Sequence, residues 1–197
     1  MQKAGILHIQ RGFTLVEAMV TVAVLVILAT IAVPGLQAFT ARSGMNAIRD
    51  DFSIALQRAR LDAISRNTCV SMCQLASPGS AVCATSDQGN WHRGWVVFMN
   101  EACGDAPAGA LPAANVIAVR EPGNGRFRLT QKPANGGGGT VIETITFNPR
   151  GTLVQGVATY QVTDAQDEAS PHRRDVALSF QGRVSVVAAS DEKKADQ

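Results

Sequence analysis

The stretch QRGFTLVEAMVTVAVLVILATIAVPG, residues 10–35, decides the fold class of this chain. From Ala18 to Val33 it contains no charged residue, and with residues 13–17 it reaches about the 20 residues that a membrane-spanning helix needs. It lacks the polar face at 3.6-residue spacing that a soluble core helix shows. The stretch is therefore a membrane helix or the apolar core of a signal sequence.

The residues around this stretch favour cleavage before it rather than after it. A secretory signal normally ends in a small-residue site after its apolar core, and VPGLQAFTARSG offers no good site of that kind. A better position lies at Gly12. The leader, residues 1–12, carries Lys3 and Arg11 and no acidic residue, which favours a cytoplasmic location for this end. Without the leader the formal charge falls from +2 to zero.

Glu17 places a carboxylate near the start of the apolar run. An ionised carboxylate in hydrocarbon costs several kcal/mol, so we expect it to be paired or to serve a function. The alternative is a glutamate at the membrane edge that reaches the polar interface.

The motif RGFTLVE, followed by an apolar helix with Pro34, resembles the class III signal of type IV pilins and pseudopilins. The resemblance implies that a prepilin peptidase cuts between Gly12 and Phe13 and methylates the new amino terminus of Phe13. It also implies that Glu17 is an assembly residue, which pairs with the Phe13 amine of a neighbouring subunit. Such a pair discriminates register, because a misdocked subunit leaves both charges unpaired. An uncleaved N-terminal anchor is the alternative.

The helix is expected to continue beyond the membrane to residue 66. Spanning residues 13–66, it would be about 80 Å long, with residues 13–35 in the membrane. We expect a kink or loosening at Pro34-Gly35 and a weaker point of flexibility at Gly44. The later part is amphipathic, and its apolar residues fall mostly at three- and four-residue steps: Phe39, Ile48, Phe52, Leu56, Ala59, Ala63 and Ile64.

After Asn67 the composition changes to short runs rich in Val, Ile, Thr and Phe, separated by Pro, Gly, Asn and Asp. This pattern predicts an antiparallel β head over residues 67–190, with GWVVF as a core strand and a hairpin turn at Gln181-Gly182. The charged residues 191–197 are expected to form a disordered tail. The fold class is therefore α+β and type IV pilin-like, with a long N-terminal helix packed on the β head.

Four blocks of the mature chain are similar to the GspH/FimT type of minor pseudopilin and minor pilin. In chain order they are ALQRARLDAISRNTCVSMC, WHRGWVVFMN, ITFNPRGTL and VALSFQGRVSV. The resemblance implies a minor pilin near the tip of a type IV pilus, or a GspH-type minor pseudopilin of a type II secretion system. The implied partners are other major and minor pilins or pseudopilins, the prepilin peptidase and the inner-membrane assembly platform. The implied location is a single pass through the inner membrane with the head in the periplasm.

The head contains four cysteines, Cys69, Cys73, Cys83 and Cys103. An oxidising periplasm favours disulfides, and the spacing contains no C-x-x-C pair that would favour a metal site. Three pairings are possible. Our hypothesis is Cys73–Cys83, which closes the QLASPGSAV loop, and Cys69–Cys103, which ties the first strand to the end of the GWVVF strand.

The sequence contains no motif of a known catalytic class. The three histidines, His8, His92 and His172, belong to no such pattern, and ANGGGGT at 134–140 lacks the Lys-Ser/Thr of a phosphate loop. We therefore expect neither an enzyme nor a cofactor or metal.

DNA binding is the second function class, because some FimT-type minor pilins of competence systems bind DNA through a C-terminal G-R-x-R pattern. GRVS at 182–185 keeps the first arginine and has Ser185 in place of the second. From Asn67 onward, 11 Lys and Arg face 12 Asp and Glu, a balance that disfavours a dedicated DNA binder. The candidate contacts are Arg183, Arg173, Arg174, Arg126 and Arg128, of which the last two share strand parity with Lys132. The alternative for these cations is a solvated face or protection of an edge strand.

Cleavage at Gly12 is the first testable prediction. Intact-mass analysis of the native protein should show loss of residues 1–12 and one added methyl group. Replacement of Gly12 by a bulky residue should leave the leader attached and block assembly. A mature protein that still contains Met1 would contradict the prediction.

Overall fold

A computed structural model of the chain describes residues 13–85, 89–132, 141–167 and 173–188. The chain divides into two compact units, residues 1–40 and 41–197. The leader and the tail 191–197 lie outside the described residues, as do His8 and His172.

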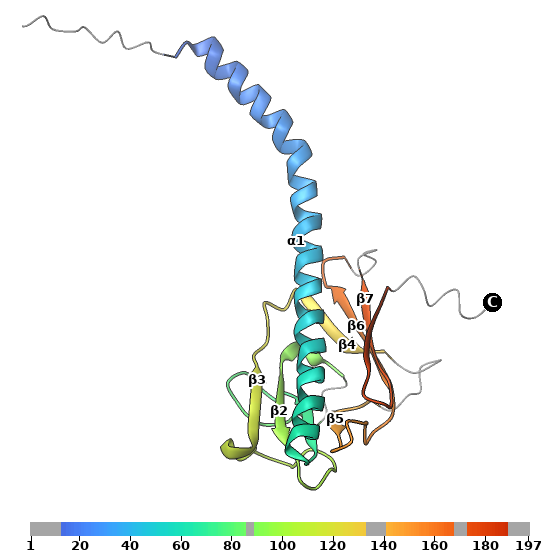
Figure 1. The fold of residues 1–197 in the computed structure, drawn as a ribbon. Coiled ribbons are helices and arrows are strands. Elements are labelled where there is room, and N and C mark those ends of the chain that lie inside the picture. The colour runs from blue at the N-terminus through green and yellow to red at the C-terminus, as the bar shows by residue number, and fades with distance from the viewer. Residues whose placement is uncertain (1–12, 86–88, 133–140, 168–172, 189–197) are drawn as a thin grey trace, which may run out of the picture. The chain divides into compact units, whose positions relative to one another are not determined.

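A single helix, α1 (Leu15–Arg66), accounts for the N-terminal third of the chain (Figure 1). It is long and apolar enough to cross a membrane, with an 18-residue window of mean hydropathy 2.6 that is not buried by the rest of the chain. Helical structure continues without a break through positions 34 and 35. The loosening expected there therefore does not end the helix.

The later part of α1 buries one face. Ile48, Phe52, Leu56, Ala59 and Ala63 are buried as their spacing predicted, and Met45 joins them. Two residues that the sequence assigned to this face are exposed, Phe39 at 67% and Ile64 at 45%. Phe39 belongs to the first unit, in which every residue with a described side chain is exposed, and Ile64 lies one position beyond the buried stripe at Ala63.

The described residues of the head form two four-stranded antiparallel sheets. The first has the order β3-β2-β1-β5, and the second has the order β4-β6-β7-β8. The strands are β1 (Val70–Gln74), β2 (Trp95–Met99), β3 (Val116–Arg120), β4 (Phe127–Gln131), β5 (Thr144–Phe147), β6 (Ala158–Asp164), β7 (Arg174–Leu178) and β8 (Val184–Ala188). Two 3-10 turns, η1 (Trp91–Arg93) and η2 (Ala113–Asn115), precede β2 and β3. The fold class predicted from the sequence, a helix packed on antiparallel strands, is confirmed.

The core joins the buried face of α1 to both sheets in one cluster. Its centre is Phe52, whose ring makes edge contacts with Trp91 at 5.5 Å, Trp95 at 5.3 Å and Tyr160 at 4.9 Å between centroids. Such aromatic pairs contribute about 0.5–1.5 kcal/mol each beyond the area they bury. Gly44 is not merely a flexible point, because a Cβ there would overlap the Phe127 ring. It provides close packing between α1 and β4.

The hairpin expected at Gln181-Gly182 connects β7 to β8. Its turn is closed by bonds from the Gly182 N–H to the Ser179 carbonyl and from the Ser179 N–H to the Arg183 carbonyl, at 2.8 and 3.0 Å. Gly182 adopts φ +72°, a left-handed conformation that other residues rarely take. GWVVF is also a core strand, since Trp95, Val96, Val97 and Phe98 are all buried.

Candidate functional site

The first turn of α1 is organised by Thr14. Its hydroxyl accepts a bond from the Glu17 N–H at 3.2 Å, and its carbonyl accepts one from the Ala18 N–H at 3.1 Å. Thr14 is therefore the N-cap, and T-L-V-E matches the S/T-x-x-E pattern of a capping box. This role of Thr14 was not predicted from the sequence, although the S/T-x-x-E pattern was the available signal.

This cap fixes Glu17 at the third helical position, in the turn where the helix dipole favours a negative charge. Glu17 is exposed, and so is Phe13, at 79%. Gly12 lies outside the described residues. Both partners of the expected assembly pair are therefore accessible to another chain.

Two threonine hydroxyls of the apolar helix are satisfied within the helix. Thr21 and Thr30 donate their hydroxyls to the carbonyls of Ala18 and Ile27, at 2.9 and 2.7 Å. Hydrocarbon offers no water to such groups, so internal bonds remove the cost of burying them. The chemistry of this surface suits lipid or the helices of neighbouring subunits.

Two disulfides link the cysteines of the head, Cys69 to Cys103 and Cys73 to Cys83. These are the two pairings that the sequence analysis favoured. The first spans 34 residues and joins the start of β1 to the segment after β2, while the second spans 10 residues. Disulfides with loops of this size stabilise a fold by roughly 2–4 kcal/mol, chiefly by restricting the unfolded chain.

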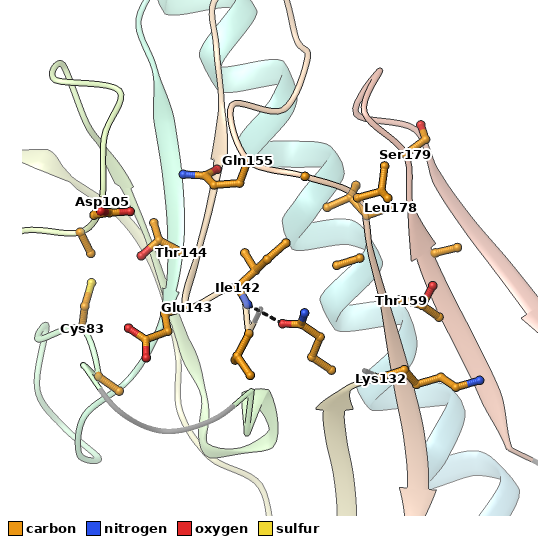
Figure 2. A pocket seen from close by; sticks show the side chains of 18 of the residues that line it. Cys83, Asp105, Lys132, Ile142, Glu143, Thr144, Gln155, Thr159, Leu178 and Ser179 are labelled. Atoms are coloured by element: carbon orange, nitrogen blue, oxygen red, sulfur yellow. Dashed lines mark hydrogen bonds between the residues drawn. The ribbon is translucent and has the colours of Figure 1, made fainter. Parts of the chain in front are cut away.

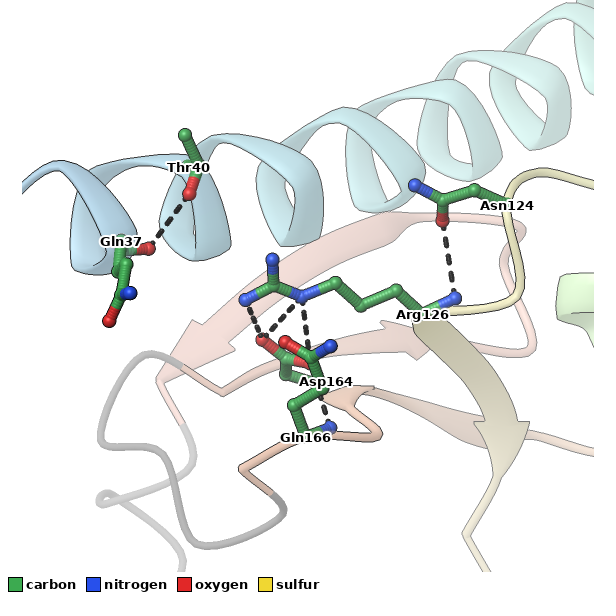
Figure 3. A network of polar contacts seen from close by, with 6 residues as sticks. All are labelled: Gln37, Thr40, Asn124, Arg126, Asp164 and Gln166. Atoms are coloured by element: carbon green, nitrogen blue, oxygen red, sulfur yellow. Dashed lines mark hydrogen bonds and ion pairs between the residues drawn. The ribbon is translucent and has the colours of Figure 1, made fainter.

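Arg126 forms an ion pair with a buried carboxylate rather than a free basic surface (Figure 3). Its guanidinium nitrogen Nη2 lies 2.8 Å from Oδ2 of Asp164, and Nε donates to both carboxylate oxygens at 3.2 Å. Asp164 is only 1% exposed. The bond from Arg126 lowers the pKa of Asp164 against the opposing effect of burial, and the Gln166 N–H adds a further bond.

Lys132 is held in a similar way, with Nζ 3.2 Å from Oδ2 of Asp175, which is 4% exposed. Of the three cations that share strand parity, Arg126 and Lys132 thus neutralise buried carboxylates, while Arg128 is exposed. Asp164 and Asp175 were not predicted from the sequence as the partners of these two cations.

The remaining DNA candidates do not form one patch. Arg174 begins β7 and pairs with Ala188, and Arg173 precedes it, whereas Arg183 lies in the turn at the other end of the same hairpin. Five residues at about 3.3 Å each separate the two ends by roughly 15 Å. His92 lies in η1, and the described residues contain no group of His, Cys, Asp and Glu that could hold a metal.

The geometry defines a class of protein: a single apolar N-terminal helix with a capped glutamate, continuing into the core of a disulfide-bonded, two-sheet head. The profile of the family described as type II transport protein GspH matches residues 50–182, and a prokaryotic N-terminal methylation motif matches residues 7–33. The chain belongs to the GspH family, which confirms the resemblance to GspH/FimT-type minor pilins and pseudopilins.

Solved structures provide a second comparison. A crystal structure of the type IV minor pilin FimU of Pseudomonas aeruginosa gives a TM-score of 0.54 at 20% identity, covering 77% of this chain and 94% of FimU. The structure of the minor pseudopilin EpsH of the type 2 secretion system of Vibrio cholerae gives a TM-score of 0.43 at 11% identity. The match covers 75% of this chain and 96% of EpsH. At these identities the likeness to FimU establishes a shared fold. No match is found among curated proteins.

The ion pair of Arg126 leads to a prediction about acid. Arg126→Ala leaves the buried Asp164 carboxylate unpaired and should lower the free energy of unfolding by about 1–3 kcal/mol at pH 7. Because the folded-state pKa of Asp164 is lowered, the contribution of the pair is present above its unfolded pKa of about 3.9 and is lost as the pH falls through the folded value. The difference in free energy of unfolding between the wild type and the Arg126→Ala variant should therefore become smaller below about pH 4.

Urea unfolding of the full chain in detergent micelles measures this difference, with tryptophan fluorescence as the signal, since both tryptophans lie in the head. Arg150→Ala is the matched control, because Arg150 is an exposed arginine in the turn after β5. It should change stability by less than about 0.5 kcal/mol. Equal effects of the two variants at pH 7 would contradict the prediction.

Proposed function

We propose that this chain is a minor pilin, a structural subunit that primes assembly of a type IV pilus near the filament tip. The observation that carries this proposal is the apolar part of α1, which the rest of the chain leaves unburied and which presents Glu17 in its first turn. A continuous apolar surface of this size requires an apolar environment. Lipid provides it before assembly, and neighbouring helices provide it in the filament.

The assembly chemistry rests on one charge pair. The prepilin peptidase cuts between Gly12 and Phe13 and methylates the new amine of Phe13, which keeps its positive charge. On a neighbouring subunit, Glu17 lies in an apolar surface and needs a cation to offset its desolvation. The pair therefore selects the docked register in which neither charge is left alone.

The location follows from the same features. The chain crosses the inner membrane once, the assembly platform engages it there, and the head lies in the periplasm, where the two disulfides form. Other pilins are the partners of the helix.

A minor pseudopilin of a type II secretion system is the second candidate, and the description of the matching family favours it. The fold shared with FimU favours the pilus. The two candidates differ in the subunits that co-purify with the membrane-extracted protein. Identification of those subunits by mass spectrometry decides between pilus and pseudopilus.

The Glu17 variant tests the assembly role. Glu17→Ala should still insert into the membrane, because loss of a charge eases insertion. It should fail to enter filaments, because the Phe13 amine of the neighbour is left unpaired. Glu17→Asp, which keeps the charge, is the matched control. It should enter filaments at part of the wild-type level. Wild-type incorporation of Glu17→Ala, measured by immunoblot of sheared filaments, would exclude an assembly role for this residue.

The neutral charge balance and the paired cations lead to a prediction about DNA. Full-length protein in detergent micelles should bind double-stranded DNA with a Kd weaker than about 10⁻⁶ M at physiological salt, as non-specific binding does. A mobility-shift titration measures this. Sub-micromolar binding that Arg183→Ala abolishes would instead identify a competence pilin, with Arg173, Arg174, Arg126 and Arg128 as the next residues to replace.

A further inference from the structure

Two tight turns of the head meet on the side chain of Arg60, in the last part of α1. The first turn, residues 148–151, follows β5, and the second, residues 179–183, joins β7 to β8. Nε of Arg60 donates to the Gly151 carbonyl at 2.8 Å. A Cβ on Gly182 would overlap that carbonyl and lie 3.0 Å from Nε of Arg60. The half-buried Arg60 guanidinium is therefore held between the two turns at a defined position.

Each turn adds an exposed arginine beside Arg60. Arg150 directly precedes Gly151, and Arg183 directly follows Gly182. Consecutive Cα atoms are about 3.8 Å apart, so the backbone of each arginine lies next to a glycine that packs against Arg60. Within the described ranges, no carboxylate forms an ion pair with any of the three arginines. Three positive side chains therefore share one region of the head.

Elsewhere in the head, aspartates neutralise the positive side chains. An aspartate forms an ion pair with each of Arg49, Arg58, Arg66, Arg120, Arg126 and Lys132. Glu143 directly precedes β5 and lines a cleft of about 890 Å³ together with Asp105 (Figure 2). Glu143 thus stands at the opposite end of β5 from Arg150. The positive charge is local, although the head as a whole is close to neutral.

Apolar side chains lie beside these arginines. Phe180, in the second turn, is 53% exposed, and Ile64 of α1 is 45% exposed. Ile64 packs against the first turn, because a Cβ on Gly151 would lie 2.7 Å from its Cδ1 atom. Aromatic residues and arginine are enriched in protein–protein interfaces. The mixture of arginine and exposed apolar side chains is therefore typical of a surface that another protein covers.

We propose that this region, the arginine patch, docks an acidic segment on the head of a neighbouring subunit. The patch consists of Arg60, Ile64, Arg150, Phe180 and Arg183. A guanidinium presents two parallel N–H donors that match a carboxylate. Because the Gly151 carbonyl already fixes Arg60, binding a carboxylate there costs little side-chain entropy. The partner segment carries at least two carboxylates next to an apolar side chain, which covers Phe180.

The arrangement favours a protein partner over a nucleic acid. Affinity for duplex DNA grows with the number of phosphates that a protein neutralises, and these phosphates follow one another along the duplex. The arginine patch offers three cations in one compact place, and Arg173 and Arg174 lie at the other end of the β7–β8 hairpin. A short acidic segment needs no longer track of positive charge.

This inference rests on the proposed function, because the neighbouring subunit is the one that packs on the exposed part of α1. Exposed ion pairs are weak on their own. Once the helices have packed, however, the two heads are held at a high effective concentration, and weak pairs are then sufficient. The helix thus provides the affinity, and the arginine patch selects which head lies beside this one.

The first test uses the ¹⁵N-labelled full chain in uncharged detergent micelles. The probe is a blocked pentapeptide of four glutamates around a central leucine. It should shift the Gly151 and Gly182 amides and the Arg60 Nε–H signal in a saturable way, at millimolar peptide. A tenfold rise in salt should weaken binding about fivefold, because salt screens exposed charges. The Arg150→Glu/Arg183→Glu double variant should bind about tenfold more weakly than the wild type.

The second test measures entry of the full chain into filaments, by immunoblot of sheared filaments. Arg150→Glu/Arg183→Glu should insert into the membrane but enter filaments at about one fifth of the wild-type level or less. Arg150→Lys/Arg183→Lys keeps both charges and is the matched control, which should enter at more than half of the wild-type level. Tryptophan fluorescence of both variants checks that the head is folded. Should the glutamate variant not fold, Arg150→Gln/Arg183→Gln makes the same comparison.

Four results would overturn the proposal. The first is no shift of the three signals at millimolar glutamate peptide, or an equal shift by the same peptide with lysine in place of glutamate. The second is saturation by inorganic phosphate where the glutamate peptide does not bind. The third is sub-micromolar binding of duplex DNA that the glutamate double variant loses. The fourth is wild-type entry of the glutamate double variant into filaments. If Glu17→Ala is excluded from the same filaments, the filament role stands and the arginine patch alone is refuted.

Discussion

The head depends on the packing of one helix side chain, Phe52, against both sheets. Its ring contacts Trp95 of β2 in the first sheet and Tyr160 of β6 in the second, and Trp91 of η1 completes the group. All four rings are buried, and their contacts join the helix and the two sheets in one core. Ala59 and Ala63, about two and three turns further on, are small enough to keep α1 close to the strands.

The Cys73–Cys83 disulfide reinforces a part of the head that lies outside the main core cluster. Cys73 and Cys83 belong to a second, smaller cluster with Leu75, Val96 and Phe98, which is separate from the main core. A small cluster buries too little apolar surface to order its loops against their conformational entropy. Covalent closure of the loop reduces that entropy, so the second cluster needs fewer contacts.

The sequence predicted the features that depend on local pattern. The apolar run, the spacing of Ile48, Phe52 and Leu56, and the alternation of valine-rich segments follow from period and composition alone. It could not assign Arg126, because strand parity identifies the face of a cation but not its partner. Asp164 lies 38 residues away and meets Arg126 only through the register of β4 and β6. The role of Gly44 was hidden for the same reason, since the Phe127 ring that it accommodates comes from a distant strand.

Gln155 shows how a polar side chain in a segment without regular structure becomes part of the sheet. Besides accepting the Thr146 N–H, it donates to the Thr146 hydroxyl at 3.3 Å. That hydroxyl lies 2.8 Å from the Ser71 hydroxyl, which accepts a bond from the Asn100 side chain at 2.9 Å. Asn100 also donates to the Gly104 carbonyl at 2.8 Å, directly after the disulfide-bonded Cys103. The buried members of this network satisfy one another across β1 and β5, as buried polar groups in a stable core must. Gln155 is its outermost member, and without it the Thr146 hydroxyl keeps its contact with Ser71. The neighbouring Val154 N–H donates to the Thr146 carbonyl at 2.9 Å, so Val154 and Gln155 together satisfy both outward backbone groups of Thr146.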